Sequence, residues 1–184
     1  MLIMSKVEQL LSQYAAYHLD TKNIYTHFIG IPMIVFSVFC FAAKPGVMLG
    51  HFDFTLTLFL MILSLAFYFS LDRRFGMIMS LLFMVSYPFA YVVAQLSTQT
   101  WLMISSSFFV LGWIIQFVGH IFEKKKPAFV DDLTGLAIGP LFVVAEIVFI
   151  LGYRQEMKQS VLKQARALRL EMDQTSLIFK TIEK

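Results

Sequence analysis

Five apolar stretches, each close to the length of a membrane-crossing helix, follow one another along this chain of 184 residues. A bilayer hydrocarbon core of about 30 Å takes about 20 helical residues to cross. The stretches are Ile24 to Ala43, Phe54 to Leu71, Phe75 to Gln95, Trp101 to Phe122 and, more weakly, Leu133 to Tyr153. Hydrophobic residues make up 58% of the chain and charged residues only 15%, which is too apolar for a soluble domain of this size. Because the alternation typical of a barrel is absent, we predict an all-α, multi-span membrane helical bundle.

Amphipathic helices are predicted at both ends of the apolar region. Near the start, apolar side chains recur at three- and four-residue steps and predict an interfacial helix over residues 1–19. The residues of this face are Val7, Leu10, Leu11, Tyr14 and His18. The tail, residues 154–184, shows a similar pattern and is predicted to form a cytosolic or interfacial helix. We expect one integral membrane domain over residues 1–184, with the bundle at residues 24–153.

The basic residues predict the topology, because short loops rich in Lys and Arg stay in the cytoplasm. If all five stretches cross, seven basic residues lie inside and eight outside; if the fifth dips in and returns, only Lys44 lies outside. We therefore predict four crossings plus a broken or re-entrant fifth segment, interrupted at Gly135 and at Gly139-Pro140. Both termini are then cytoplasmic, at a bacterial inner membrane or an endoplasmic reticulum membrane.

Three of the four histidines are predicted to reach the cytoplasmic face. His18 and His27 lie at the inner end of the first stretch and His120 at the inner end of the fourth, whereas His51 lies in an outer loop as a surface residue. Ionisable groups inside membrane helices cost about 2.5 to 3.5 kcal/mol at mid-helix, so they mark candidate functional sites. Asn23 precedes His27 by four residues and Glu123 follows His120 by three, so both share a helix face with an imidazole. Histidines without thiolates suit iron or zinc, and the spacing alone names no reaction.

Three motifs resemble a known family. "YHLDTKNIYTH" has the form Tyr-His, four residues, Asn, three residues, His; "QFVGHIFEKKKPAF" and "GPLFVVAEIVF" follow it in the chain. In this order they resemble the membrane 2-hydroxy fatty acid dioxygenase family, whose fungal member takes part in phytosphingosine degradation. The resemblance covers most of the chain. One spacing differs from the family pattern, since two residues rather than three separate His120 from Glu123.

The resemblance implies an iron(II)-dependent dioxygenase that uses dioxygen to shorten a long-chain 2-hydroxy fatty acid by one carbon. It implies catalytic roles for His18, His27, His120, Asn23 and Glu123. The three histidines would hold Fe²⁺, with Glu146 as a further ligand or its hydrogen-bond partner. Three protein ligands on octahedral iron leave positions for the hydroxyl and carboxylate of the substrate and for dioxygen.

The surroundings of the site suggest where the substrate would bind. The anionic head group of the substrate would meet the basic residues of the inner face, which are Arg73, Arg74, Lys124, Lys125 and Lys126. The same cluster also fits plain topology determination and attraction to anionic lipids. The acyl chain of the substrate would lie between the helices of the bundle, within the lipid bilayer.

Two other function classes remain open from the sequence. A zinc-dependent membrane lipid hydrolase would use the same histidines with a bound water. A non-catalytic small membrane protein would use them only for packing. Nucleic acid is not expected as a partner, because the net charge is only +3 and the preference of Lys and Arg for cytoplasmic loops already accounts for the basic residues.

Overall fold

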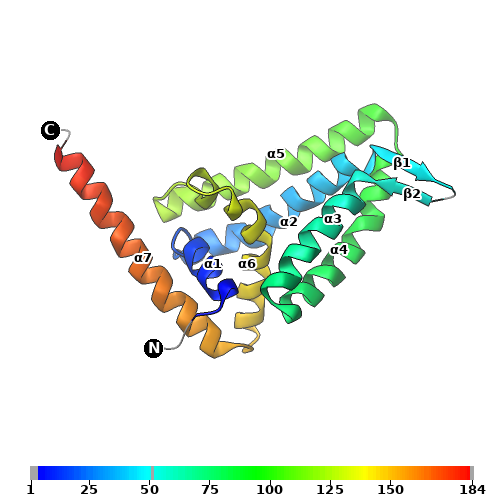
Figure 1. Ribbon diagram of the computed structural model, residues 1–184. Helices are drawn as coiled ribbons and strands as arrows, with labels where there is room; N and C mark the ends of the chain where they lie inside the picture. Colours follow the sequence, from blue (N-terminus) through cyan, green and yellow to red (C-terminus); the bar gives the residue numbers. More distant parts are fainter. Residues whose placement is uncertain (1–3, 51, 183–184) are drawn as a thin grey trace. The chain divides into compact units, whose positions relative to one another are not determined.

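The computed structural model describes residues 4–50 and 52–182, which form seven α-helices, one hairpin and one short 3₁₀ turn (Figure 1). The helices are α1 (Lys6–Ala15), α2 (Thr21–Ala43), α3 (Leu56–Leu71), α4 (Arg73–Ala94), α5 (Thr98–Glu123), α6 (Thr134–Ile150) and α7 (Gln155–Ile182). The other elements are β1 (Gly46–Leu49), β2 (Phe52–Thr55) and η1 (Ala128–Val130). The all-α prediction is confirmed except for the hairpin. His51 and the ends of the two predicted terminal helices lie outside the described residues.

The chain folds as two compact units, one of residues 1–24 with 120–184 and one of residues 25–119. The second unit contains a very close approach of α2 and α5. A Cβ atom placed on Gly30 would lie 2.9 Å from the carbonyl oxygen of Gly112, and one on Gly112 would lie 3.0 Å from that of Gly30. Small residues let membrane helices approach until their backbones touch. The two glycines therefore fix the distance between the helices that carry His27 and His120.

In the same unit, α3 and α4 pack against each other and are joined through a single residue, Asp72. Its carboxylate accepts a hydrogen bond from the backbone N–H of Phe75 at 3.0 Å and so caps α4. The hairpin pairs Gly46 with Thr55 and Leu49 with Phe52, and Gly50 adopts a φ of 66° at its tip. The sequence did not predict it, because β1 is exposed throughout and lacks the apolar alternation of a half-buried strand.

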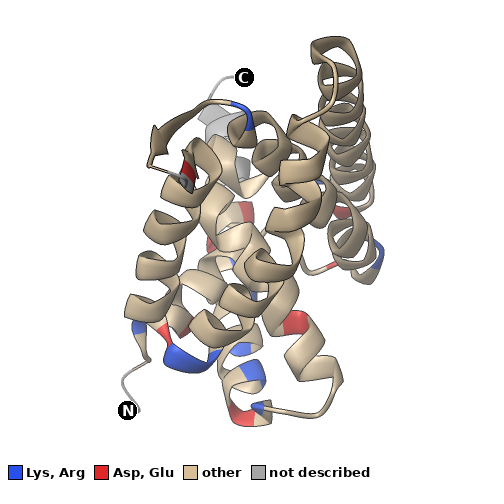
Figure 2. Cartoon of the chain, turned by 90° about the vertical axis from the view of Figure 1, so that its right-hand side faces the viewer, with Lys and Arg blue, Asp and Glu red and all other residues tan. Residues whose placement is uncertain are grey.

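The charged residues that the structure describes in the second unit lie at helix ends or in the hairpin, and the middle of the helices carries none (Figure 2). They are Lys44, Asp53, Asp72, Arg73 and Arg74. The helices between them expose large apolar side chains, such as Ile62 (60%), Met84 (65%) and Phe89 (64%). Exposed apolar surface of this extent indicates contact with lipid.

Three helices, α2, α4 and α5, are long and apolar enough to cross a membrane, with 23, 22 and 26 residues. This supports membrane association. Helices α3 and α6 are apolar but shorter, with 16 and 17 residues, or about 25 Å each at 1.5 Å per residue. Four crossings and a re-entrant fifth segment therefore stay a prediction.

In the first unit, α1 packs against both α6 and α7. Helix α1 opens with a capping box, in which Ser5 accepts from the backbone of Glu8 and Glu8 accepts from the backbone of Ser5. Its predicted apolar face is buried against neighbouring helices, with Val7 and Leu11 each 1% exposed. On α7, Val161 and Ala165 are buried in the same way. Both faces that the sequence assigned to the membrane surface thus pack, at least in part, inside the protein.

Two of the sequence predictions for the segments of this unit are wrong. Helix α1 ends at Ala15, so His18 lies in the following turn rather than on a helix reaching residue 19. Helix α6 runs without interruption through Gly139 and Pro140. One proline removes a single backbone hydrogen bond, which a buried apolar helix tolerates when its neighbours pack well. Gly135 has a different role, since a Cβ atom there would lie 3.0 Å from the backbone nitrogen of Phe129.

Candidate metal centre

His18 is held in a tight turn that follows α1. The backbone N–H of Tyr17 donates to the carbonyl of Tyr14, and that of His18 donates to the carbonyl of Ala15. This turn folds the imidazole back over the end of the helix, where it stacks on the ring of Tyr14 at 4.1 Å between centroids and 8° between planes. His18 is only 2% exposed. Tyr14 and His18 therefore lie on the same side, as the sequence predicts, although the turn after α1 and not the helix itself brings them together.

The hydrogen bond of the His18 ring defines its tautomer. Nδ1 lies 2.7 Å from the carbonyl oxygen of Tyr14. Because a carbonyl oxygen can only accept, Nδ1 carries the proton and a neutral ring keeps its lone pair on Nε2. Histidines that bind metals are oriented by this kind of bond from their other nitrogen. His18 is thus prepared to act as a ligand through Nε2.

His18, His27 and His120 form one cluster, in which each ring offers a ligand nitrogen and these nitrogens lie within 4.8 Å of one another. The rings of His18 and His120 meet edge to face at 5.0 Å between centroids. All three side chains are buried, with exposed fractions of 2%, 1% and 8%. Three buried imidazoles with no thiolate among them are a donor set that fits a borderline divalent cation. The three residues that the sequence proposed as ligands are brought together.

Asn23 and Glu123, the two predicted helpers, bind each other. Nδ2 of Asn23 donates to Oε2 of Glu123 at 3.1 Å and to the carbonyl of Tyr17 at 3.4 Å. The same Oε2 accepts from the backbone N–H of Asp20 at 2.8 Å. Both side chains are buried, at 0% and 6% exposure. Their contacts connect the backbone segments around the histidines, and a catalytic role for either residue stays a prediction.

The remaining predicted site residues do not join the cluster. Glu146 on α6 is not among the three residues whose ligand atoms converge, so its role as a ligand stays a prediction. Lys125 forms an ion pair with Asp173, and Lys126 forms one with Asp131 at 2.5 Å. Lys124 is exposed, and Arg73 and Arg74 are exposed at the start of α4 in the other compact unit. The structure gives two of the five basic residues acidic partners, and their contact with a substrate stays a prediction.

Arg169 on α7 is a residue of this site that the sequence did not reveal. Its guanidinium donates to Oε1 of Glu123 at 2.8 Å and to the carbonyl oxygen of Ala16 at 2.5 Å. Arg169 belongs to the amphipathic tail predicted over residues 154–184, and 46 residues separate it from Glu123. Only the packing of α7 on α1 brings the pair together.

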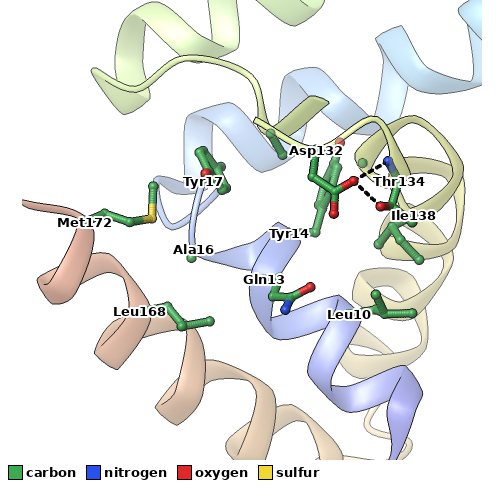
Figure 3. A pocket seen from close by; sticks show the side chains of 12 residues that line it. Leu10, Gln13, Tyr14, Ala16, Tyr17, Asp132, Thr134, Ile138, Leu168 and Met172 are labelled. Atoms are coloured by element: carbon green, nitrogen blue, oxygen red, sulfur yellow. Dashed lines mark hydrogen bonds between the residues drawn. The ribbon is translucent and has the colours of Figure 1, made fainter. Parts of the chain in front are cut away.

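A cavity of about 270 Å³ lies in the first unit (Figure 3). Its apolar wall includes Leu10, Ile138, Leu168 and Met172, and its polar residues include Gln13, Tyr17 and Asp132. Tyr14 also lines the cavity and stacks on His18, so this one ring borders both. An apolar cavity with a few polar groups suits an amphipathic ligand.

Two acidic residues near the cavity are held by specific partners. Hydrogen bonds from Lys126 and from the hydroxyl of Tyr17 hold the pKa of Asp131 below its usual range. Partial burial and the acceptor Asp131 raise the pKa of Tyr17 to about 12. Asp132 accepts from the backbone and hydroxyl of Thr134 at the start of α6, as drawn in Figure 3. Asp132 therefore supports the helix start, while Asp131 ties the basic loop to Tyr17.

The chain is similar to known proteins over most of its length. Residues 4–151 match the family described as 2-hydroxy-palmitic acid dioxygenase Mpo1-like. The chain is also 31% identical over 155 residues to the 2-hydroxy-palmitic acid dioxygenase MPO1 of Saccharomyces cerevisiae. The matched residues cover 82% of this chain and 84% of the yeast protein. The chain belongs to the Mpo1-like family. The resemblance seen in the sequence motifs is thereby confirmed.

All three clustered histidines lie within the part of the chain that matches the Mpo1-like family. Arg169 lies beyond it, on α7. None of the solved structures matches this chain.

Proposed function

We propose that this chain is an iron(II)-dependent dioxygenase that acts on long-chain 2-hydroxy fatty acids and shortens them by one carbon. The observation that carries the proposal is the cluster of His18, His27 and His120, in a chain whose yeast relative is named a 2-hydroxy-palmitic acid dioxygenase. The protonated Nδ1 of His18 supports it further, because it puts the lone pair of a neutral ring on Nε2, the atom that would coordinate the metal.

The three histidines would hold the metal through neutral nitrogen atoms. Iron(II), when bound, supplies the redox chemistry that lets dioxygen react with an organic substrate. Because imidazole ligands add no negative charge, the site would keep the full charge of the cation and attract the carboxylate of a 2-hydroxy acid. Burial of all three rings keeps bulk water from the reacting groups.

The proposal is tested by supplying the purified protein, loaded anaerobically with iron(II), with 2-hydroxypalmitate and oxygen. We expect an acid one carbon shorter to accumulate in step with oxygen consumption, as measured by mass spectrometry and an oxygen electrode. Product formation that is independent of oxygen would contradict the proposal.

A three-histidine set also binds zinc in hydrolytic enzymes, so a zinc-dependent lipid hydrolase is the second candidate. Metal analysis after anaerobic purification separates the two. Activity restored to the metal-free protein by zinc and not by iron(II) would favour the hydrolase.

The cavity lined by Leu168 suggests where the acyl chain of the substrate lies. Its wall is mostly apolar (Figure 3), and Tyr14, which lines it, stacks on His18. A Leu168→Trp substitution would add a ring to this wall and shorten the space for the chain. We expect kcat/KM for 2-hydroxypalmitate to fall about 10-fold or more, and to fall less for a 2-hydroxy acid of eight carbons.

Leu170→Trp provides a matched control for this substitution. Leu170 lies two residues further along α7, does not line the cavity and is 63% exposed. Its substitution should leave the preference for chain length unchanged. If Leu168→Trp lowers kcat/KM equally for both chain lengths, the acyl chain does not lie in this cavity.

A further inference from the structure

One side chain of the tail helix, Arg169, reaches the backbone on both sides of the histidine cluster. Its Nη1 donates to the carbonyl oxygen of Ala16 at 2.5 Å, two residues before His18. Its Nη2 donates to the carbonyl oxygen of Glu123 at 3.2 Å and to Oε1 of Glu123 at 2.8 Å, three residues after His120. Arg169 thus connects the turn that carries His18 with the end of the helix that carries His120.

Glu123 continues this connection to the segment that leads to His27. Its second oxygen, Oε2, accepts from the backbone N–H of Asp20 at 2.8 Å and from the side chain of Asn23 at 3.1 Å. Asn23 precedes His27 by one helical turn on α2. Two nitrogens of Arg169 and two oxygens of Glu123 therefore form hydrogen bonds with chain segments that lie close in sequence to each of the three histidines.

The ion pair between Arg169 and Glu123 is largely buried, with side-chain exposures of 15% for Arg169 and 2% for Glu123. Charge-assisted hydrogen bonds to the planar guanidinium are directional, and lysine cannot reproduce their fork geometry. Removing one partner of such a pair leaves an uncompensated buried charge. By contrast, Arg169 meets Asp173 at 3.8 Å and at 47% exposure of the carboxylate, an exposed contact of the kind that contributes little.

We propose that Arg169 and Glu123 are positioning residues that set the metal affinity of the three-histidine cluster by fixing the backbone that carries its rings. The inference rests on the proposed metal site and goes beyond it, because Arg169 lies outside the residues that match the Mpo1-like family. It gives α7 a part in the site although α7 contributes no ligand.

The test is a metal titration of the full-length protein in detergent. Metal-free protein is titrated with Co²⁺, whose visible absorption reports coordination, in competition with a chelator. We expect Arg169→Gln to raise the dissociation constant by about 10- to 100-fold, as loss of a residue that supports metal ligands commonly does. Arg169→Lys, which keeps the charge without the fork, should give an intermediate value.

Arg166→Gln is the matched control, because Arg166 is an exposed arginine on the same helix, one turn earlier. Its affinity for Co²⁺ should equal that of the unmodified protein. A residue that only stabilised the fold would lower the melting temperature of the metal-free protein without changing the dissociation constant. If Arg169→Gln shows this pattern, with affinity within about twofold of the unmodified protein, the proposal is overturned.

If Arg169→Gln does not fold, the double variant Glu123→Gln/Arg169→Gln takes its place, since it leaves no buried charge unpaired. Its Co²⁺ affinity should also fall, and unchanged affinity would again overturn the proposal. Failure of the proposed function gives a different result. In that case the unmodified protein does not bind Co²⁺, or His120→Ala binds Co²⁺ as tightly as the unmodified protein does.

Discussion

Replacing His120 by alanine should abolish stoichiometric metal binding and lower 2-hydroxy acid turnover by more than about 100-fold, the upper end of what loss of a mere supporting residue costs. His120 offers one of three nitrogens that converge within 4.8 Å, and two imidazoles do not make a complete protein ligand set. The measurements are metal content after dialysis and the rate of product formation. His18→Ala and His27→Ala should behave alike.

His51→Ala is the control for these variants, because His51 is the one other histidine of the chain and the sequence predicts it in a loop on the opposite side of the membrane. It should keep full metal content and activity. If His120→Ala also keeps both, the cluster is a packing feature and the assignment of the site is wrong.

Enlarging Gly30 to leucine should destabilise the protein and weaken metal binding together. A Cβ atom at this position already lies 2.9 Å from the carbonyl oxygen of Gly112 and 2.8 Å from Nε2 of Gln116. Overpacking costs about 1–3 kcal/mol, which exceeds the roughly 1 kcal/mol that a helix gains when glycine is replaced. Because His27 lies three residues before Gly30, separation of α2 from α5 would also shift a ligand.

The effect of Gly30→Leu is measured as the melting temperature and the Co²⁺ dissociation constant in the same detergent. Ile29→Phe is the control, since Ile29 is adjacent in sequence and 58% exposed. It enlarges a side chain that has room outside the protein and should change neither value. Equal behaviour of the two variants would show that the contact between the glycines does not constrain the helices.

The helical segments could be predicted because their signal is local. The expected stretch from Phe75 to Gln95 agrees closely with α4, and the stretch from Trp101 to Phe122 lies inside α5. Apolar runs of this length have few alternatives to a helix in a membrane. The hairpin and the unbroken course of α6 were not predicted, since the first has no apolar alternation and the second depends on its buried surroundings.

The three histidines that cluster could be picked out from the sequence, whereas the contacts around them could not. His18, His27 and His120 were identified because histidines at membrane helix ends are rare and costly. Arg169 carried no such signal, since an arginine on an amphipathic helix is ordinary. The predicted part of Glu123 as a helper of His120 stays open, while its contacts with Asp20, Asn23 and Arg169 could not be foreseen from spacing.

By itself, the sequence determined the helical class, the membrane character, the family motifs and the three imidazoles, because each depends on hydrophobicity or residue type within a short segment. Only the tertiary structure decided which side chains meet. The contact of Gly30 with Gly112 and the link from Arg169 to Glu123 both arise between segments far apart in the sequence, whose separation in space no local pattern encodes. The physical reason is that burial and hydrogen bonding at these positions depend on the packing of several helices at once.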